Sequence, residues 1–259
     1  MTLVQQELKK CYIWSTAVKK IYKGSTKIRQ AQYTWPELCF TANTAGSTVR
    51  LTRTGSPTAV TLETSTDGST RTTYTIGNTI TLSNVGDKVY WRNKSETQTG
   101  FSTSIYNYYK FVMSWSVAAS WDIWYLLCKN STTSLTDFCF IYLFKDDYYL
   151  TEAPKLPATT LALRCYYWLF ENCSGLVSLP KLPALTLTTY CYGHLFYGCS
   201  KIKISTTQTW EYQTPYRIPT TWSGTTATSA LTNMFTGTWW TFTWTPTINT
   251  TYYTSNAVI

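Results

Sequence analysis

The sequence has few of the residues on which catalysis depends. Of its 259 residues only 14% are charged, 13 are Asp or Glu, and His194 is the single histidine. With one histidine, no His-based triad or His–carboxylate pair can be repeated in the chain. Asp146 and Asp147 are the one adjacent pair of carboxylates, and a solvated turn explains them better than a cleft. Glycine-rich phosphate loops are also missing. We therefore expect no enzyme: no catalytic residues and no cofactor.

Metal-site spacing and long apolar runs are missing as well. The eight cysteines include no Cys-x-x-Cys pair, so a zinc site is not expected. No apolar run is long enough to span a membrane. The first ten residues lack the apolar core of a signal peptide. If the protein works outside a cell, we expect either that it leaves by another route, such as phage lysis, or that its leader is missing from this sequence.

The surface must be built from uncharged polar and aromatic residues. Aromatics make up 17% of the chain, and Thr, Ser, Tyr and Asn replace the missing charges. This composition suits β-structure and is typical of extracellular, cell-surface or virion proteins. The net charge of +9 is dispersed, with one cluster between Lys9 and Arg29. A nucleic-acid partner requires a basic stripe and a known module, so we expect a solvated basic face instead.

Three blocks of the sequence repeat at a constant interval. They begin at Cys139, Cys165 and Cys191, which lie 26 residues apart (165 − 139 and 191 − 165). A fixed period of this size marks stacked repeats. The positions that define the repeat are these: Cys139, Phe144, Cys165, Phe170, Cys173, Cys191, Phe196 and Cys199.

Each repeat is predicted to contain one helix and one short strand. After Pro157, Thr159 or Thr160 is a plausible N-cap, and apolar residues at steps of four from Leu161 predict one buried helical face. The strand is expected at 176–179. Equivalent cysteines would then form ladders, either as disulfides or as buried thiols. Buried thiols are favoured, because Asp147 replaces the second cysteine of the first unit.

The remainder of the chain predicts β-structure. Residues 1–34 contain an internal duplication that indicates a hairpin, read either as an attachment segment or as a strand pair that caps the next domain. Residues 35–122 carry short alternating segments separated by turn residues, which predict a β-sandwich-like domain. Leucine-rich repeats at 123–205 and a C-terminal loop and cap at 206–259 would follow. The expected fold class is therefore α+β, with an all-β domain before a short solenoid.

Residues 156–176, which read Leu-Pro-Ala-Thr-Thr-Leu-Ala-x-x-Cys-Tyr-x-x-Leu-Phe-x-x-Cys-Ser-x-Leu, resemble the repeat of the BspA-like leucine-rich repeat family. A degraded copy occupies residues 182–202. Flanking segments at 79–93 and 246–256 are similar to those often found with such repeats. The resemblance implies a surface-exposed adhesion or host-binding protein of a bacterium or a phage.

Several tryptophans stand where the resemblance has glycine. Trp is a poor residue for a tight turn, whereas Gly adopts positive φ without strain. Our hypothesis is that the source reads UGA as Gly and that the sequence was translated with UGA as Trp; the alternative is a set of true surface aromatics that contact a ligand. The positions in question are Trp14, Trp115, Trp121, Trp210, Trp222, Trp239, Trp240 and Trp244.

Two functional classes remain open. The first is a non-catalytic binding or adhesion protein that presents one face of the repeats to a host-cell surface protein or glycan, with no nucleic acid and no membrane insertion. The second is a carbohydrate-active enzyme or its glycan-binding module. The candidate partner-binding residues are Tyr148, Tyr149, Val177, Ser178, Lys201 and Lys203. The sequence does not determine the ligand or the oligomeric state.

Overall fold

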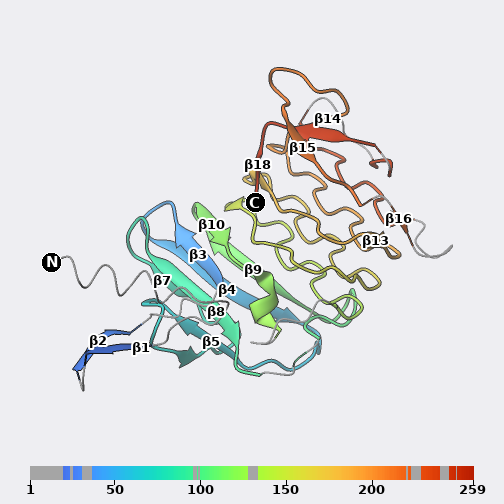
Figure 1. Ribbon diagram of the computed structural model, residues 1–259. Helices are drawn as coiled ribbons and strands as arrows, with labels where there is room; N and C mark the ends of the chain where they lie inside the picture. Colours follow the sequence, from blue (N-terminus) through green and yellow to red (C-terminus); the bar gives the residue numbers. More distant parts are fainter. Residues whose placement is uncertain are drawn as a thin grey trace. The chain divides into compact units, whose positions relative to one another are not determined.

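The computed structural model describes residues 20–23, 26–30, 37–95, 98, 100–127, 134–219, 221–222, 229–239, 245–248 and 250–259. The chain divides into two compact units, Met1–Trp35 and Pro36–Ile259. In the first unit, β1 (Lys20–Lys23) pairs antiparallel with β2 (Thr26–Gln30), as a hairpin requires (Figure 1). The other half of the duplication, at residues 12–19, lies outside the described residues.

Two sheets form the first part of the larger unit. The order β11-β10-β3-β8-β5-β6 defines one sheet, and β7-β4-β9 defines the other (Figure 1). Each strand from β3 to β9 overlaps a segment where the alternation of residues predicted one. The strand bounds are β3 Leu38–Ala42, β4 Ser47–Thr54, β5 Leu62–Ser65, β6 Thr72–Thr73, β7 Ile80–Leu82, β8 Lys88–Asn93, β9 Tyr108–Ser114, β10 Val117–Ser120 and β11 Leu150–Glu152.

Aromatic side chains join the two sheets into one core. Phe40 from β3 and Trp91 from β8 both pack edge-on against Phe111 from β9, with ring centroids 4.8 and 5.1 Å apart. All three side chains are completely buried. Alternate residues of β4 and β9 point into this core, which is the period-two pattern of a half-buried strand.

The predicted helices are absent, so the α+β class with a leucine-rich-repeat solenoid is wrong. The chain is 33% strand, its small sheets do not close into a solenoid, and the described residues form a 3₁₀ turn, η1 (Ile123–Leu126), but no α-helix. The segments expected to be helical are runs of turns instead. We call them the four turn runs, at residues 138–147, 164–173, 190–199 and 229–238. None of the described residues forms a helix able to cross a membrane.

Backbone conformation explains why apolar residues at steps of four do not give helices here. Every fourth residue of a turn run has positive φ, which no right-handed helix allows. The first three runs are rich in aromatic residues and Cys, whose helix propensity is low. The residues with positive φ are Phe138, Tyr142 and Asp146, then Arg164, Trp168 and Asn172, then Tyr190, His194 and Gly198, and lastly Ser229, Asn233 and Gly237.

Backbone hydrogen bonds in the turn runs alternate between two kinds of partner. Ile141 N–H donates to Phe138 O three residues back (3.0 Å), whereas Phe140 N–H donates to Cys165 O in the next run (2.9 Å). The same alternation continues through the second and third runs. Each run therefore satisfies half of its amides locally and half by stacking, so a single run could not stand alone.

The third and fourth runs are joined in the same way despite a longer interval. Tyr192 N–H donates to Ala230 O (2.9 Å) and Phe196 N–H to Met234 O (2.9 Å). Equivalent residues are here 39 positions apart (229 − 190), because the segment between them is longer. The similarity of 230–238 to the end of a repeat thus corresponds to a real fourth layer.

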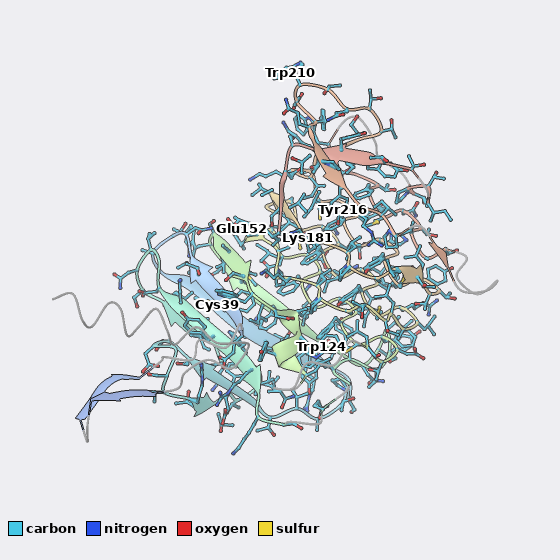
Figure 2. The ribbon with its side chains drawn as sticks, viewed as in Figure 1. Cys39, Trp124, Glu152, Lys181, Trp210 and Tyr216 are labelled. Atoms are coloured by element: carbon cyan, nitrogen blue, oxygen red, sulfur yellow. The ribbon has the colours of Figure 1, made fainter. Side chains whose placement is uncertain are left out.

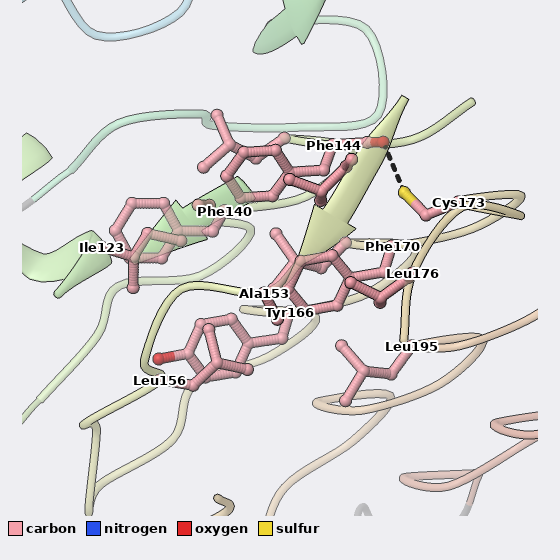
Figure 3. Packing of buried hydrophobic residues seen from close by; sticks show 14 of the residues in the cluster. Ile123, Phe140, Phe144, Ala153, Leu156, Tyr166, Phe170, Cys173, Leu176 and Leu195 are labelled. Carbon is pink, nitrogen blue, oxygen red and sulfur yellow. Dashed lines mark hydrogen bonds between the residues drawn. The ribbon is translucent and has the colours of Figure 1, made fainter. Parts of the chain in front are cut away.

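Buried aromatic rings run through the stack as a ladder. Phe144 stacks on Phe170 with centroids 5.5 Å apart, and Phe170 stacks on Phe196 at 5.8 Å (Figure 3). The ladder reaches the sheets through Phe111, 5.5 Å from Phe144, and reaches the fourth run through Phe235, 5.6 Å from Phe196. Sheets and stack therefore share a continuous core.

The C-terminal residues pair with two different layers of the stack. Strand β18 (Ala257–Val258) pairs parallel with β12 (Ser178–Leu179) (Figure 1). Strand β17 (Tyr252–Thr254) pairs antiparallel with β14 (Ile204–Ser205) and with β15 (Thr214–Tyr216). A further parallel pair joins β13 (Thr186–Leu187) to β16 (Thr221–Trp222). The C-terminal segment therefore pairs with the strands of the second and third layers.

Candidate functional site

One exposed surface carries most of the residues expected to bind a partner. We call it the ladder face and define it by Tyr148, Tyr149, Val177, Lys201 and Lys203. The side chains of Tyr148, Tyr149 and Val177 are 56%, 46% and 41% exposed. Tyr149 and Lys201 lie two periods apart, at equivalent positions of the first and third layers.

The backbone beneath the ladder face is hydrogen-bonded from layer to layer. Val117 N–H donates to Tyr149 O (3.0 Å), and Val177 N–H donates to Thr151 O (2.8 Å). The exposed side chains of Tyr149 and Val177 therefore lie on hydrogen-bonded backbone immediately before β11 and β12. Ser178 differs from the other candidates, because it is 1% exposed and its Oγ accepts a hydrogen bond from Ala153 N–H (2.8 Å).

A hollow of about 420 Å³ lies on this face, next to Val177, Lys201 and Lys203. Its other walls are Trp239 and the C-terminal residues 255–257. Trp239 lies at the hollow because its backbone N–H donates to Ile202 O (2.8 Å). This hydrogen bond adds one more pairing to the stack. The size suits a small ligand group, because pockets for small molecules start at about 300 Å³.

Asn256 holds the wall of the hollow in place. Its Nδ2 donates to Val177 O (3.0 Å) and to Lys201 O (3.1 Å), and its Oδ1 accepts from Lys203 N–H. One side chain thus joins the second layer, the third layer and the C-terminal segment. Sequence reasoning missed Asn256, since nothing local shows that the C-terminal segment inserts between two repeats.

The two lysines of the hollow differ in their electrostatic environment. Lys203 Nζ lies 3.1 Å from Glu211 Oε1 and 5.9 Å from the centroid of the Trp239 ring. Among the described residues, Lys201 has no carboxylate partner and is exposed. The hollow therefore combines one compensated cation, one uncompensated cation and one half-exposed indole ring.

The cysteines of the repeats are buried structural thiols. Cys139, Cys165 and Cys191 are buried, as are Cys173 and Cys199, and none forms a disulfide. Cys173 Sγ donates to Phe144 O of the preceding run (3.0 Å; Figure 3). Burial raises the pKa of Cys191 to about 11, so its thiol stays protonated at neutral pH. The interpretation as buried thiols is confirmed for these five residues.

Asp147 occupies the cysteine position of the first run and has a different partner. Its Oδ2 accepts from Met113 N–H of β9 (2.9 Å), and its Oδ1 accepts from Tyr149 N–H (3.2 Å). The carboxyl is 4% exposed, and burial raises its pKa to about 6 despite these donors. The cysteine at this position in the second run donates to a carbonyl of the preceding run. In the first run the preceding layer is β9, which presents the Met113 N–H donor, so the side chain at this position must be an acceptor.

The tryptophans that prompted the recoding hypothesis fall into separate groups. Trp115 and Trp121 have φ of 60° and 64° and are largely exposed, as expected of positions that favour glycine. Trp239 has no positive φ. Trp210 is 86% exposed in a loop (Figure 2). Nothing is described of the side chain of Trp222, and Trp14, Trp240 and Trp244 lie outside the described residues.

Other chemistry is sparse in the part of the chain that the structure describes. Those residues contain no group of three or more His, Cys, Asp or Glu that could hold a metal ion. Burial lowers the pKa of His194, whose ring packs against Tyr167 and Trp168. Comparisons with protein-family models, with curated proteins and with solved structures found no match to this chain.

Proposed function

We propose that this protein binds a host-cell surface protein or glycan through the ladder face and does not turn it over. The observation that supports this proposal is the alignment of Tyr148, Tyr149 and Val177, all exposed, on hydrogen-bonded backbone. Tyr is enriched in recognition surfaces because its ring is rigid and amphipathic. Such a protein would act outside the producing cell, on a cell surface or a virion, as the BspA-like resemblance of the repeat also implies.

Rigid presentation is the physical argument for binding by this face. A partner that contacts side chains on backbone already hydrogen-bonded between layers orders little of that backbone when it binds, so less of the interaction energy is lost to entropy. The adjacent hollow supplies a concave element, which flat surfaces lack. Lys201, which has no carboxylate partner among the described residues, adds positive charge, in keeping with a chain of net charge +9.

The test is a binding assay on candidate host cells and glycans with the full chain. Tyr148→Ala combined with Tyr149→Ala should reduce saturable binding by about tenfold or more, the loss expected of exposed aromatic anchors. The matched control is Tyr106→Ala. Tyr106 is 74% exposed but precedes β9, at the opposite end of that strand from the ladder face.

Three outcomes decide the proposal. Specific binding that depends on Tyr148 and Tyr149 but not on Tyr106 supports it. Equal loss in both variants, or no saturable binding, contradicts it. Release of product from a bound glycan would instead establish the alternative, a carbohydrate-active enzyme.

A further inference from the structure

We infer that the hollow beside Trp239 binds the anionic group of an acidic carbohydrate. This inference rests on the proposed function and specifies the ligand of the same face. Lys201 is the residue that contacts the carboxylate or sulfate, and the Trp239 ring is the surface on which the sugar ring packs.

Charge is the first part of the argument. Of the two lysines, Lys203 is already paired with Glu211, so its ammonium is largely neutralised. Lys201 is exposed and has no carboxylate partner among the described residues. The other residues lining the hollow, Val177, Trp239 and the segment 255–257, carry no charge. A ligand with a negative group is therefore complementary to the hollow, whereas a cationic ligand is not.

The aromatic wall is the second part. Trp239 is 47% exposed, and Lys203 lies over its ring at 5.9 Å, which orients the indole. An indole offers a flat apolar surface and one N–H donor, and this combination suits a ligand with an apolar ring face and polar edges. A sugar ring has that character, and an extended acidic peptide has it only in part.

Pre-organisation is the third part. Asn256 makes three hydrogen bonds with the backbone at Val177, Lys201 and Lys203. These bonds hold the backbone of both lysines in fixed register before any ligand arrives. The volume of about 420 Å³ is enough for one or two sugar units.

The experiment measures binding of the full chain to matched oligosaccharides: one with a uronic acid, one with a sulfate and one neutral. We expect at least one acidic ligand to bind about 5–10-fold tighter than the neutral one, which is less than a buried charge-assisted hydrogen bond gives because Lys201 is exposed. The two acidic arms distinguish carboxylate from sulfate. The preference should shrink as salt is raised, because the site is open to solvent.

Variants locate the preference. Lys201→Met should remove the preference for acidic ligands, and Lys201→Arg should retain it. Lys181→Met is the matched control, since Lys181 is exposed but lines a different hollow. Trp239→Gly should weaken the binding of acidic and neutral ligands alike, and Trp239→Phe should bind more tightly than Trp239→Gly.

Several results would overturn the inference. They are equal affinity for acidic and neutral ligands, a preference that survives Lys201→Met, unchanged binding by Trp239→Gly, or a Lys201-dependent preference for acidic peptides over acidic sugars. If the chain still binds host cells through Tyr148 and Tyr149 in any of these cases, the proposed function stands and only its ligand is wrong.

Discussion

The sheets at 37–127 and the turn runs at 138–238 differ in how their backbone hydrogen-bond partners are spaced along the sequence. In the sheets, Thr48 pairs with Ser114 and Thr54 with Tyr108, so the interval between partners changes along the strand. In the first three runs, interlayer backbone bonds keep a constant interval of 25 residues, as between Phe140 N–H and Cys165 O (165 − 140). Antiparallel register is fixed by core packing, whereas stacked layers keep register because identical side chains lie above one another.

The junction between the two regions shows what each must supply to the other. Phe111 N–H donates to Leu143 O (2.8 Å), and Met113 N–H donates to Asp147 Oδ2. Strand β9 therefore serves as the layer that precedes the first run. The fourth run closes the opposite end through Phe235. The stack is short, and it is stable because both of its ends are covered.

The largest effect is expected from removal of one rung of the aromatic ladder. Phe170 is completely buried and has a stacked ring on each side, Phe144 and Phe196. Phe170→Ala should lower the free energy of unfolding by about 3–5 kcal/mol, the cost of a large cavity in a packed core. Denaturant unfolding measures this loss, and a loss below about 1 kcal/mol would contradict the packing described.

A matched substitution in the sheets tests whether the two regions unfold together. Phe40→Ala removes an equally buried ring from β3. If the shared core makes one cooperative unit, both variants should lower hydrogen-exchange protection in the sheets and in the runs by similar amounts. If Phe170→Ala lowers protection only in the runs, the stack opens independently of the sheets.

The same contrast explains what could be predicted from the sequence. In the sheets, alternation revealed the elements, such as β3 at Leu38–Ala42, but not their order, since partner choice depends on the whole core. In the runs, the period revealed the partners, such as Phe144 and Phe170, but the element type was wrong. Apolar residues at steps of four fit a helix and also a run of turns with positive φ at every fourth residue.

Residues that favour positive φ were the available signal for turns. Asp146, Asn172, Gly198 and Gly237 occupy equivalent places, and Asp, Asn and Gly are the types that tolerate this conformation. One such residue per repeat also fits the C-terminal end of a helix. This signal therefore does not distinguish a helix from a run of turns. Within the site, the sequence predicted Val177, Lys201 and Lys203, whereas Asn256 depends on a chain reversal that no local pattern encodes.

A smaller effect is expected from pH at the junction between the two regions. Burial raises the pKa of Asp147 from 3.8 to about 6, so the fold disfavours the ionised carboxylate. The free energy of unfolding should therefore fall as pH rises from about 4 to about 6, by about 2–3 kcal/mol from this group, and then level off. Denaturant unfolding at a series of pH values measures the slope.

Substitutions show which carboxyl group causes the pH dependence of the free energy of unfolding. Burial also raises the pKa of Asp122, the N-cap of η1, to about 6. Asp147→Asn should therefore reduce the slope and leave the part that Asp122 contributes, and Asp122→Asn should do the reverse. Because His194, whose pKa is lowered, contributes a slope of the opposite sign, the deciding quantity is the difference between wild type and each variant. If the contribution assigned to either Asp in this way rises with pH, the ionised form of that group is favoured instead.

The smallest effect is expected at the tryptophans with positive φ, and its sign should differ between the two regions. Trp115 has φ of 60° and a 59% exposed ring at the end of β9, so Trp115→Gly should raise the free energy of unfolding by about 1 kcal/mol. Trp168 has φ of 56°, but its ring stacks on Tyr142 at 5.1 Å, so Trp168→Gly should destabilise the protein.

Thermal or denaturant unfolding of both variants separates backbone strain from ring packing. If Trp115→Gly destabilises the protein as much as Trp168→Gly does, the packing of the Trp115 ring outweighs its backbone strain and the position is not one that favours glycine. The codons address the separate question of origin. UGG at Trp115 and Trp121 would end the recoding hypothesis, whereas UGA there would make glycine the native residue at the two turns where the backbone already has the conformation that glycine adopts freely.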